Sequence, residues 1–282
     1  MMSGVLLWWI ALCAFACVNI TAWFYTAIWL KQQKRKYDPV VFRNRQYLLW
    51  LSAIYVFVCA FRSFLPRVDV LRISLVDSWL SSIFVGRSLA TMAELSFMLE
   101  LCLLIYLLGK SMNIRLPIYS AVLSVLLIVI AEVFSWYAVL TTNNFGHVIE
   151  NSIWTIVSGL ILISLIFMWP HTPVKIKSLI RWGCVFGVGY AAFMIFDNVP
   201  MYITRWQQDL ASGKEYLSVG QGFYELFHQW TVTFEWSVWC NDVGWQTLYF
   251  STAVWLSILL VYMPPFEKTN SIQANEDKVT SN

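Results

Sequence analysis

The sequence predicts an all-α, polytopic membrane protein built as a bundle of seven transmembrane helices. Composition is the first observation, because 59% of the 282 residues are hydrophobic and only 12% are charged, about half the charged fraction of a typical soluble domain. The second is that the hydrophobic residues gather in runs of roughly 20, the length a helix needs to cross hydrocarbon. The third is an uneven distribution of basic residues, which gives the bundle a direction.

Seven apolar runs are long enough to cross a bilayer. The expected spans are Val5–Leu30, Tyr47–Leu65, Val85–Gly109, Pro117–Leu140, Val148–Trp169, Leu179–Tyr202 and Val243–Met263. The first span is not expected to be a cleavable signal peptide, because it lacks a basic leader and continues for a full span length. We assign residues 1–266 to one transmembrane domain, and the polar, aperiodic residues 267–282 to a disordered cytoplasmic tail.

Lysine and arginine set the expected orientation, because loops rich in these residues stay in the cytoplasm. Of the 19 basic residues, 13 fall in the tail or in the loops after spans one, three and five: Lys31, Lys34, Arg35, Lys36, Arg43, Arg45, Lys110, Arg115, Lys175, Lys177, Arg181, Lys268 and Lys278. The N-terminus is therefore expected outside and the C-terminus in the cytoplasm. The expected outer loops contain no N-x-S/T sequon, which fits a bacterial inner membrane.

The segment Tyr224–Asp242 is apolar but is interrupted by Glu225, His228, Glu235 and Asp242. From Trp230 to Val238 its apolar residues alternate with polar ones, a pattern typical of a strand. We therefore expect residues 204–242 to form a Trp-rich outer cap between the sixth and seventh helices. A re-entrant segment or an eighth span is the alternative.

The third span carries Arg87, Glu94 and Glu100, although each charge within hydrocarbon costs at least about 2.5–3.5 kcal/mol on insertion scales. A separation of seven residues puts Arg87 and Glu94 on nearly the same helical face, with Thr91 between them. Direct contact requires a long reach, so we expect the two charges to share a polar pocket. Glu100 points elsewhere and lies deeper, where it either faces another helix or carries a proton.

Ionisable residues within a membrane generally turn inward and pair with one another. The sequence thus predicts a charged, aromatic-lined cavity that opens outward. Its expected ligand-binding residues are Arg87, Thr91, Glu94, Asp197, Arg205 and Trp236. The alternative is that Arg87 and Glu94 only fix helix register. For Glu132 and Glu150 an interfacial or solvated position is favoured, and Asp197 is also explained as a helix terminator before Pro200.

Metal and cofactor signals are sparse. His147 and Glu150, three residues apart, offer two metal ligands on one helical face, and His228 offers a third if two outer loops meet. Two independent interfacial histidines are the simpler interpretation. A retinal Schiff base is not expected, because the seventh span contains no lysine. The 16 tryptophans form either an aromatic belt at the membrane interface or the walls of a ligand pocket.

The function favoured by these features is binding of a small or amphiphilic ligand, as a carrier or sensor, with Arg87 holding an anionic group. The main alternative is a membrane enzyme that acts on a lipid-like substrate at the outer leaflet, with Glu94, Asp197 or Glu150 as general acid or base. A proton-coupled transporter would use Glu94 and Glu100 as a relay. An assembly subunit would use the charges to dock helices. The expected surroundings are the lipid bilayer, and no feature indicates nucleic acid.

Overall fold

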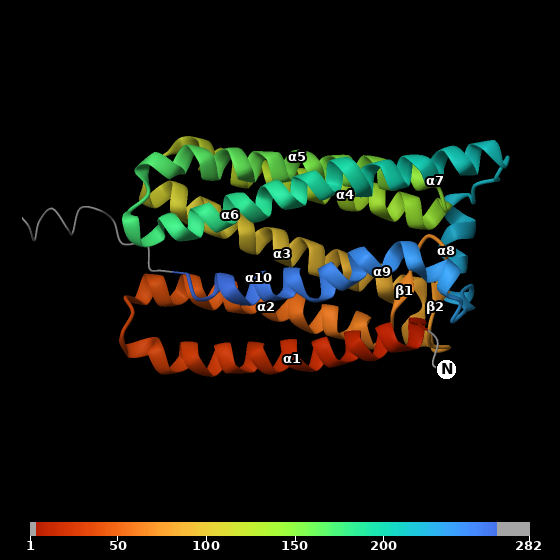
Figure 1. The fold of residues 1–282 in the computed structure, drawn as a ribbon, viewed down its shortest axis with the longest axis horizontal. Helices are drawn as coiled ribbons and strands as arrows, with labels where there is room; N and C mark the ends of the chain where they lie inside the picture. Colours follow the sequence, from red (N-terminus) through yellow and green to blue (C-terminus); the bar gives the residue numbers. More distant parts are fainter. Residues whose placement is uncertain (1–3, 264–282) are drawn as a thin grey trace, which may run out of the picture.

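Seven long apolar segments lie side by side in the computed structural model, which describes residues 4–263 (Figure 1). Five are single helices: α1 (Gly4–Gln32), α2 (Pro39–Phe64), α3 (Ile83–Ser111), α4 (Arg115–Thr141) and α5 (Asn144–Met168). The sixth joins α6 (Val174–Phe193) to α7 (Val199–Ala211) through a π-helical turn, Met194–Asn198. The seventh joins α9 (Trp236–Phe250) to α10 (Thr252–Leu260). The structure thus confirms a helical bundle with seven helical segments long and apolar enough to cross a membrane. The predicted tail, residues 267–282, lies outside the described residues.

Local sequence explains where the helices begin. Asp38 accepts a hydrogen bond from Val40 N at 2.8 Å, and Pro39 occupies the first turn of α2, where a missing N–H has no consequence. Ser82 and Asn143 cap α3 and α5 in the same way. These caps satisfy backbone N–H groups that would otherwise lack partners at the helix ends.

Small residues let the central helices approach closely. A Cβ atom added to Gly146 on α5 would lie 2.7 Å from the carbonyl oxygen of Phe134 and 2.8 Å from the Ala138 Cβ, both on α4. Such close backbone approach is typical of helix pairs in membranes, where packing drives association. The largest apolar core joins α3, α4, α5, α6 and α10 around Leu108, Ile128 and Met168.

One end of the bundle is covered by short elements (Figure 1). Helix α8 (Val219–His228) lies across this end, which also holds the start of α1. Strands β1 (Arg67–Val68) and β2 (Ile73–Ser74) pair antiparallel, and β3 (Thr231–Val232) pairs parallel to β2. Short 3-10 turns at Gln33–Arg35, Trp79–Ser81 and Trp169–His171 complete the described elements.

The expected seventh span begins too late. The sequence placed its start at Val243, but α9 begins at Trp236. The alternating pattern corresponds to a strand only at Thr231–Val232, where β2 supplies backbone partners. Beyond it, the buried residues Trp239, Asp242, Gln246 and Phe250 recur at helical spacing. Trp236–Asp242 therefore belongs to the helix, whereas Val219–His228 and Thr231–Val232 form the short elements α8 and β3.

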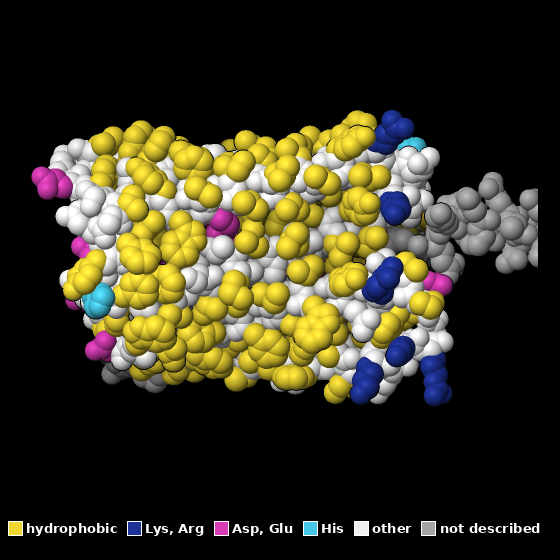
Figure 2. All heavy atoms as spheres, turned by 180° about the vertical axis from the view of Figure 1, so that it is seen from behind, with side chains coloured by type: hydrophobic (Ala, Val, Ile, Leu, Met, Phe, Trp, Pro, Cys, Tyr) yellow, Lys and Arg dark blue, Asp and Glu magenta, His cyan; other side chains and the backbone are white. Residues whose placement is uncertain are grey.

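The surface is divided by side-chain type (Figure 2). Hydrophobic side chains cover the middle of the visible face, Lys and Arg gather at one end, and most visible acidic groups lie at the other. One acidic side chain is visible within the hydrophobic band. A carboxyl group in that position needs a polar partner, since isolated charge is expensive in hydrocarbon.

Candidate functional site

Arg87 on α3 contacts two carboxylates. Its Nη2 atom donates to Glu132 Oε2 on α4 at 2.8 Å and lies 3.3 Å from Glu94 Oε2 on α3. The exposed fractions of the three side chains are 6% for Arg87, 12% for Glu94 and 6% for Glu132. The structure therefore places one buried cation between two nearly buried acids, a charge cluster shared by two neighbouring helices.

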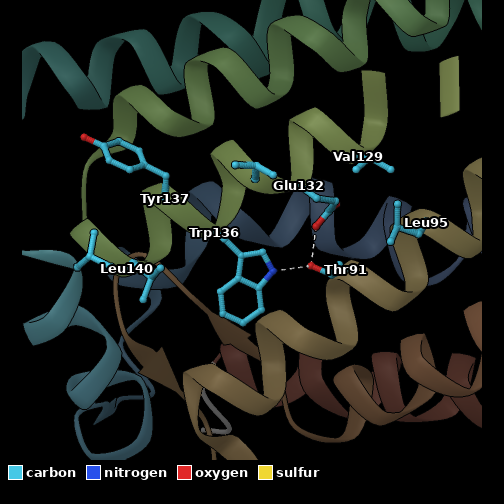
Figure 3. Close-up of a pocket in the computed structure, with 9 residues that line it drawn as sticks. Thr91, Leu95, Val129, Glu132, Trp136, Tyr137 and Leu140 are labelled. Atoms are coloured by element: carbon cyan, nitrogen blue, oxygen red, sulfur yellow. Dashed lines mark hydrogen bonds between the residues drawn. The ribbon is translucent and has the colours of Figure 1, made fainter. Parts of the chain in front are cut away.

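Thr91 connects this charge cluster to an aromatic side chain (Figure 3). Its hydroxyl donates to Glu132 Oε2 at 2.5 Å and accepts from Trp136 Nε1 at 3.1 Å. Arg87 and Thr91 are one turn apart on α3, as are Glu132 and Trp136 on α4. The two pairs meet because residues four apart share a helical face.

Two expectations about these charges are corrected. Glu132 was favoured as an interfacial group, but only 4% of the residue is exposed and it pairs with Arg87. Direct contact between Arg87 and Glu94 was judged a long reach, but it forms. The reason is that both long side chains extend along the helix axis, and a Glu side chain leans toward the helix N-terminus.

A signal for Glu132 was present in the sequence. Residues Ser124, Ile128, Ala131, Ser135 and Ala138 are buried on α4 and recur every three or four positions, mostly as small residues. Such a stripe indicates the face that packs on other helices. Glu132 lies beside that stripe, so it was placed to meet an inward-facing charge. Trp136, which is not among the expected site residues, follows one turn later.

A groove of about 510 Å³ opens between α3 and α4 beside the charge cluster. Its lining residues are Thr91, Leu95, Val129, Glu132, Val133, Trp136, Tyr137, Leu140 and Val219. Val219 belongs to α8, so the groove lies beneath the short elements at that end of the bundle. Glu132 Oε1 is buried, and the Glu132 side chain also lies within hydrogen-bonding range of the Glu94 side chain.

His147 and Glu150 form a second buried polar pair, on α5. His147 Nδ1 contacts Glu150 Oε2 directly, and the His147 ring packs against Tyr202 with 4.9 Å between centroids. Glu150 was favoured as interfacial or solvated, but only 6% of it is exposed. It lies within electrostatic range of Arg87 and Glu94.

His228 does not join this pair. It is exposed at the end of α8, where its ring stacks on Tyr224 and its Nδ1 lies 2.8 Å from the Tyr224 carbonyl oxygen. Across residues 4–263, no group of three His, Cys, Asp or Glu side chains is placed to hold a metal ion. The three-residue metal site considered from the sequence is therefore not formed, because α8 keeps His228 on the outside of the bundle.

The remaining expected site residues lie apart from the Arg87 cluster. Asp197 is exposed on the π-helical turn, whereas its neighbour Asn198 is buried. Arg205 on α7 pairs with Asp242 on α9 at 3.2 Å. Trp236 is 49% exposed and faces the start of α1. Of the six expected ligand-binding residues, the structure brings together Arg87, Thr91 and Glu94.

Glu100 occupies a separate, deeper position on α3. It is fully buried, and its Oε2 accepts a hydrogen bond from Ser257 on α10 at 2.5 Å. No ion pair of Glu100 occurs in the part of the chain that the structure describes. The expectation that Glu100 faces another helix is met by this contact.

Two arginines in the loop after α2 fix the covering elements. Arg67 donates from Nη1 to the Ser82 carbonyl oxygen at 2.6 Å, and Arg72 lies 3.4 Å from Glu225 on α8. Burial lowers the pKa of Arg67 to about 10, and Asp69 acts in the opposite direction. Burial also lowers the pKa of Arg72, with Glu225 opposing it. These contacts hold α8 and the strands over the groove.

Comparison with known proteins returned no relative. No protein-family model matches the sequence, and no curated protein or solved structure is significantly similar to the chain.

Proposed function

We propose that this membrane protein binds an amphiphile in the groove between α3 and α4, as a carrier or sensor. The observation that carries the proposal is a lipid-accessible, apolar groove whose lining includes one carboxylate side chain, Glu132. An apolar chain would lie along Val129 and Val133, and a polar head would meet Glu132. Ligand pockets commonly combine mostly apolar walls with a few polar groups that fix orientation.

The hydrogen-bonding groups favour a head that donates. The Trp136 N–H is used by Thr91, and the Thr91 hydroxyl is used by Glu132. Tyr137 also lines the groove, with its hydroxyl turned away from Glu132 (Figure 3). The charged residue of the groove lining is Glu132, and a carboxylate oxygen accepts hydrogen bonds.

The same geometry argues against an anionic head. Arg87 was the residue expected to hold such a group, but its Nη2 already contacts Glu94 and Glu132. An incoming anion would have to displace a carboxylate and then lie beside it. Like charges at this separation are strongly unfavourable in a medium of low dielectric constant. A head that carries N–H or O–H groups avoids this penalty.

The depth of Glu132 suits a small head. Nine residues separate it from Thr141, where α4 ends, which corresponds to about 13 Å along a helix. A bulky headgroup would have to sink well below the helix end. A single-headed, membrane-soluble molecule would reach this depth while its chain stays in hydrocarbon.

We also propose that the N-terminus and the covering elements face outward, in a bacterial inner membrane, with residues 212–235, between α7 and α9, contributing the outer cap. The concentration of Lys and Arg at the opposite end supports this orientation (Figure 2). In a cysteine-free background, Glu215→Cys should react with a membrane-impermeant maleimide added to intact spheroplasts, and Lys34→Cys should react only after lysis. The reverse pattern would overturn the orientation.

A groove-filling variant tests the proposed binding. Val133 lines the groove and is 64% exposed, so Val133→Trp should occupy it without touching Arg87. Val122, 54% exposed on the same helix, lies outside the groove and gives the control Val122→Trp. Native mass spectrometry in nanodiscs should show an amphiphile bound to wild type and to the control but not to Val133→Trp. Equal occupancy of both variants would contradict the site.

A further inference from the structure

We propose that the exposed face of the sixth span around Asp197 binds a transmembrane helix of a partner protein that carries a lysine or an arginine. This inference goes beyond the proposed function and concerns a different surface, on α6, α7 and the π-helical turn between them. It depends on an exposed carboxylate within the span, on a backbone carbonyl group beside it that lacks a helical donor, and on a face that the rest of the bundle leaves uncovered.

Asp197 has no polar partner within the part of the chain that the structure describes. It is exposed on the π-helical turn, whereas Met194 and Asn198 are the buried residues of that turn. No ion pair or side-chain hydrogen bond of Asp197 occurs among residues 4–263. The sequence also explained Asp197 as a helix terminator, but the helix continues into α7 from Val199. Its carboxylate is therefore free.

Asp197 lies at a depth where a lone charge is costly. Tyr190, seven residues before it, lies within electrostatic range of Glu94. Tyr202, five residues after it, lies within electrostatic range of Arg87. Asp197 is thus level with the Arg87 cluster, and the junction of α6 and α7 lies well away from both ends of the bundle (Figure 1). Ionisable residues within a membrane normally turn inward and are paired, so one that faces outward requires a partner from outside the chain.

The π-helical turn also leaves a backbone acceptor unpaired beside Asp197. Val199 donates its N–H to the Met194 carbonyl oxygen, and Pro200 has no N–H. The Ile195 carbonyl oxygen therefore lacks both donors that an α-helical or a π-helical bond would supply. Ile195 is itself exposed, and an unpaired backbone group is expensive in hydrocarbon. Single π-helical turns of this kind are frequent at functional sites.

The sixth span is the least covered of the seven. Only 11% of its most apolar stretch is buried, compared with 28–56% in the other six spans. It packs along α5 and leaves one stripe of residues exposed at separations of three, four and seven positions, which share a helical face: Trp182, Phe186, Gly189 and Phe196. A Cβ at Gly189 would meet nothing within 4 Å, so a second helix has room to approach closely there.

The chemistry of this face selects a basic partner. A lysine ammonium or an arginine guanidinium carries a positive charge and several N–H donors. Either group would donate to the Asp197 carboxylate and to the Ile195 carbonyl oxygen together. A second copy of this chain, bound through the same face, would instead bring two Asp197 carboxylates together, which is unfavourable at low dielectric constant. A helix of another protein with one basic residue at this depth is the occupant that fits.

The experiment uses synthetic transmembrane helices as probes. Three peptides of leucine and alanine share one photoreactive leucine, and each carries lysine, leucine or glutamate at the depth of Asp197. The full chain is reconstituted with each peptide in phosphatidylcholine vesicles and irradiated, and cross-linked residues are identified by mass spectrometry. The lysine peptide should label residues 186–200 about tenfold more than the leucine peptide, because it adds a charge pair to the same apolar contact. The glutamate peptide should label least.

Variants of the face assign this preference. Asp197→Asn removes the charge with little change in shape, so it should bring the lysine-to-leucine ratio to about one. Since Asp197 has no polar partner among the described residues, this variant should unfold at the wild-type midpoint. Gly189→Trp covers the same face and should reduce labelling by the lysine peptide at least about fivefold. The control Val122→Trp, on an exposed part of α4, should label as wild type does.

Four results would overturn the inference. Equal labelling by the lysine and leucine peptides in wild type would show that the face does not select a cation. A lysine preference that persists in Asp197→Asn would place the selecting group elsewhere. Disulfide cross-linking of two copies through Phe196→Cys, in the cysteine-free background and without peptide, would assign the face to a dimer. Loss of the lysine preference when phosphatidylethanolamine is added to the vesicles would assign it to a lipid amine.

Discussion

Arg87 Nη2 lies 2.8 Å from Glu132 Oε2, and this contact joins α3 to α4 within the apolar part of the bundle. Arg87 also contacts Glu94, which is not among the groove-lining residues. Arg87 and Glu94 are therefore tolerable in the third span because each lies beside a side chain of opposite charge. The contact also places a carboxylate at the groove, so the same residues can serve stability and binding.

Removal of Arg87 alone should destabilise the protein strongly. Arg87→Ala would leave Glu94 and Glu132 as neighbouring buried acids, and loss of one partner of a buried pair typically costs about 3–5 kcal/mol. The measurement is the unfolding transition of purified protein in mixed micelles of mild detergent and SDS. An unchanged midpoint would show that the cluster does not contribute to stability.

Neutralising all three groups together should recover much of that loss. The triple variant Arg87→Met, Glu94→Gln, Glu132→Gln removes the cation and both anions, and well-packed neutral replacements of buried ion pairs are often tolerated. Its unfolding midpoint should lie closer to wild type than that of Arg87→Ala. If the triple variant is the less stable of the two, packing of the Arg87 side chain outweighs charge balance.

Gly146 should be required for the close packing of α4 on α5. A Cβ at this position would lie 2.7 Å from the Phe134 carbonyl oxygen, on backbone that cannot move independently. Gly146→Ala should lower the free energy of unfolding by about 1–3 kcal/mol, as overpacking usually does. The control is Gly159→Ala on the same helix, where a Cβ would meet nothing within 4 Å. Equal effects of the two variants would disprove the close-approach explanation.

Much of the fold is predictable because a membrane span has a strong local signal. A run of apolar residues must be helical in hydrocarbon, because only then do its backbone N–H and C=O groups all find hydrogen-bond partners within the segment. All seven spans therefore follow from composition along the chain. The start of α9 was missed because Trp230–Val238 satisfies a strand pattern over a short distance, while the helical spacing from Trp239 onward extends into the next span. Backbone pairing with β2 makes Thr231–Val232 a strand, and the helical pattern prevails after it.

The site was only partly predictable for a different reason. Spacing on α3 shows that Arg87, Thr91 and Glu94 share a face, and the structure brings them together. Spacing on one helix does not show which residue of another helix lies opposite, and that residue is Glu132. Asp197 was expected in the cavity because ionisable residues within a membrane generally turn inward, but on the π-helical turn Asp197 is exposed and its neighbour Asn198 is buried.

Glu100 should tolerate neutralisation. Its carboxyl group accepts from Ser257 at 2.5 Å and forms no ion pair among the described residues. Glu100→Gln keeps the shape and a carbonyl acceptor for Ser257, so the free energy of unfolding should change by less than about 1 kcal/mol. Glu100→Ala, which leaves a cavity and an unpaired hydroxyl, should cost about 2–4 kcal/mol. The same unfolding assay compares them, and an equal loss in both variants would indicate that the acid itself is required.

Gly222 should be needed to hold α8 over the groove. A Cβ at Gly222 would lie 1.8 Å from the Leu140 carbonyl oxygen on α4, so Gly222→Ala must push α8 away from the bundle. Val219 of the same helix lines the groove beside Leu140, and displacement of α8 should therefore also open one end of the binding site. Hydrogen exchange of the α8 amides should rise by at least about tenfold, equivalent to about 1.4 kcal/mol of lost local stability.

The matched control for this variant is Gly220→Ala, because a Cβ at Gly220 meets nothing within 4 Å and an alanine favours the helix. Gly220→Ala should leave hydrogen exchange unchanged or slow it, and should leave amphiphile binding, measured by native mass spectrometry, at the wild-type level. Gly222→Ala should change both measurements together if α8 shapes the groove. Faster exchange in α8 with unaltered amphiphile binding would show that α8 does not shape the groove and that the ligand is held by α3 and α4 alone.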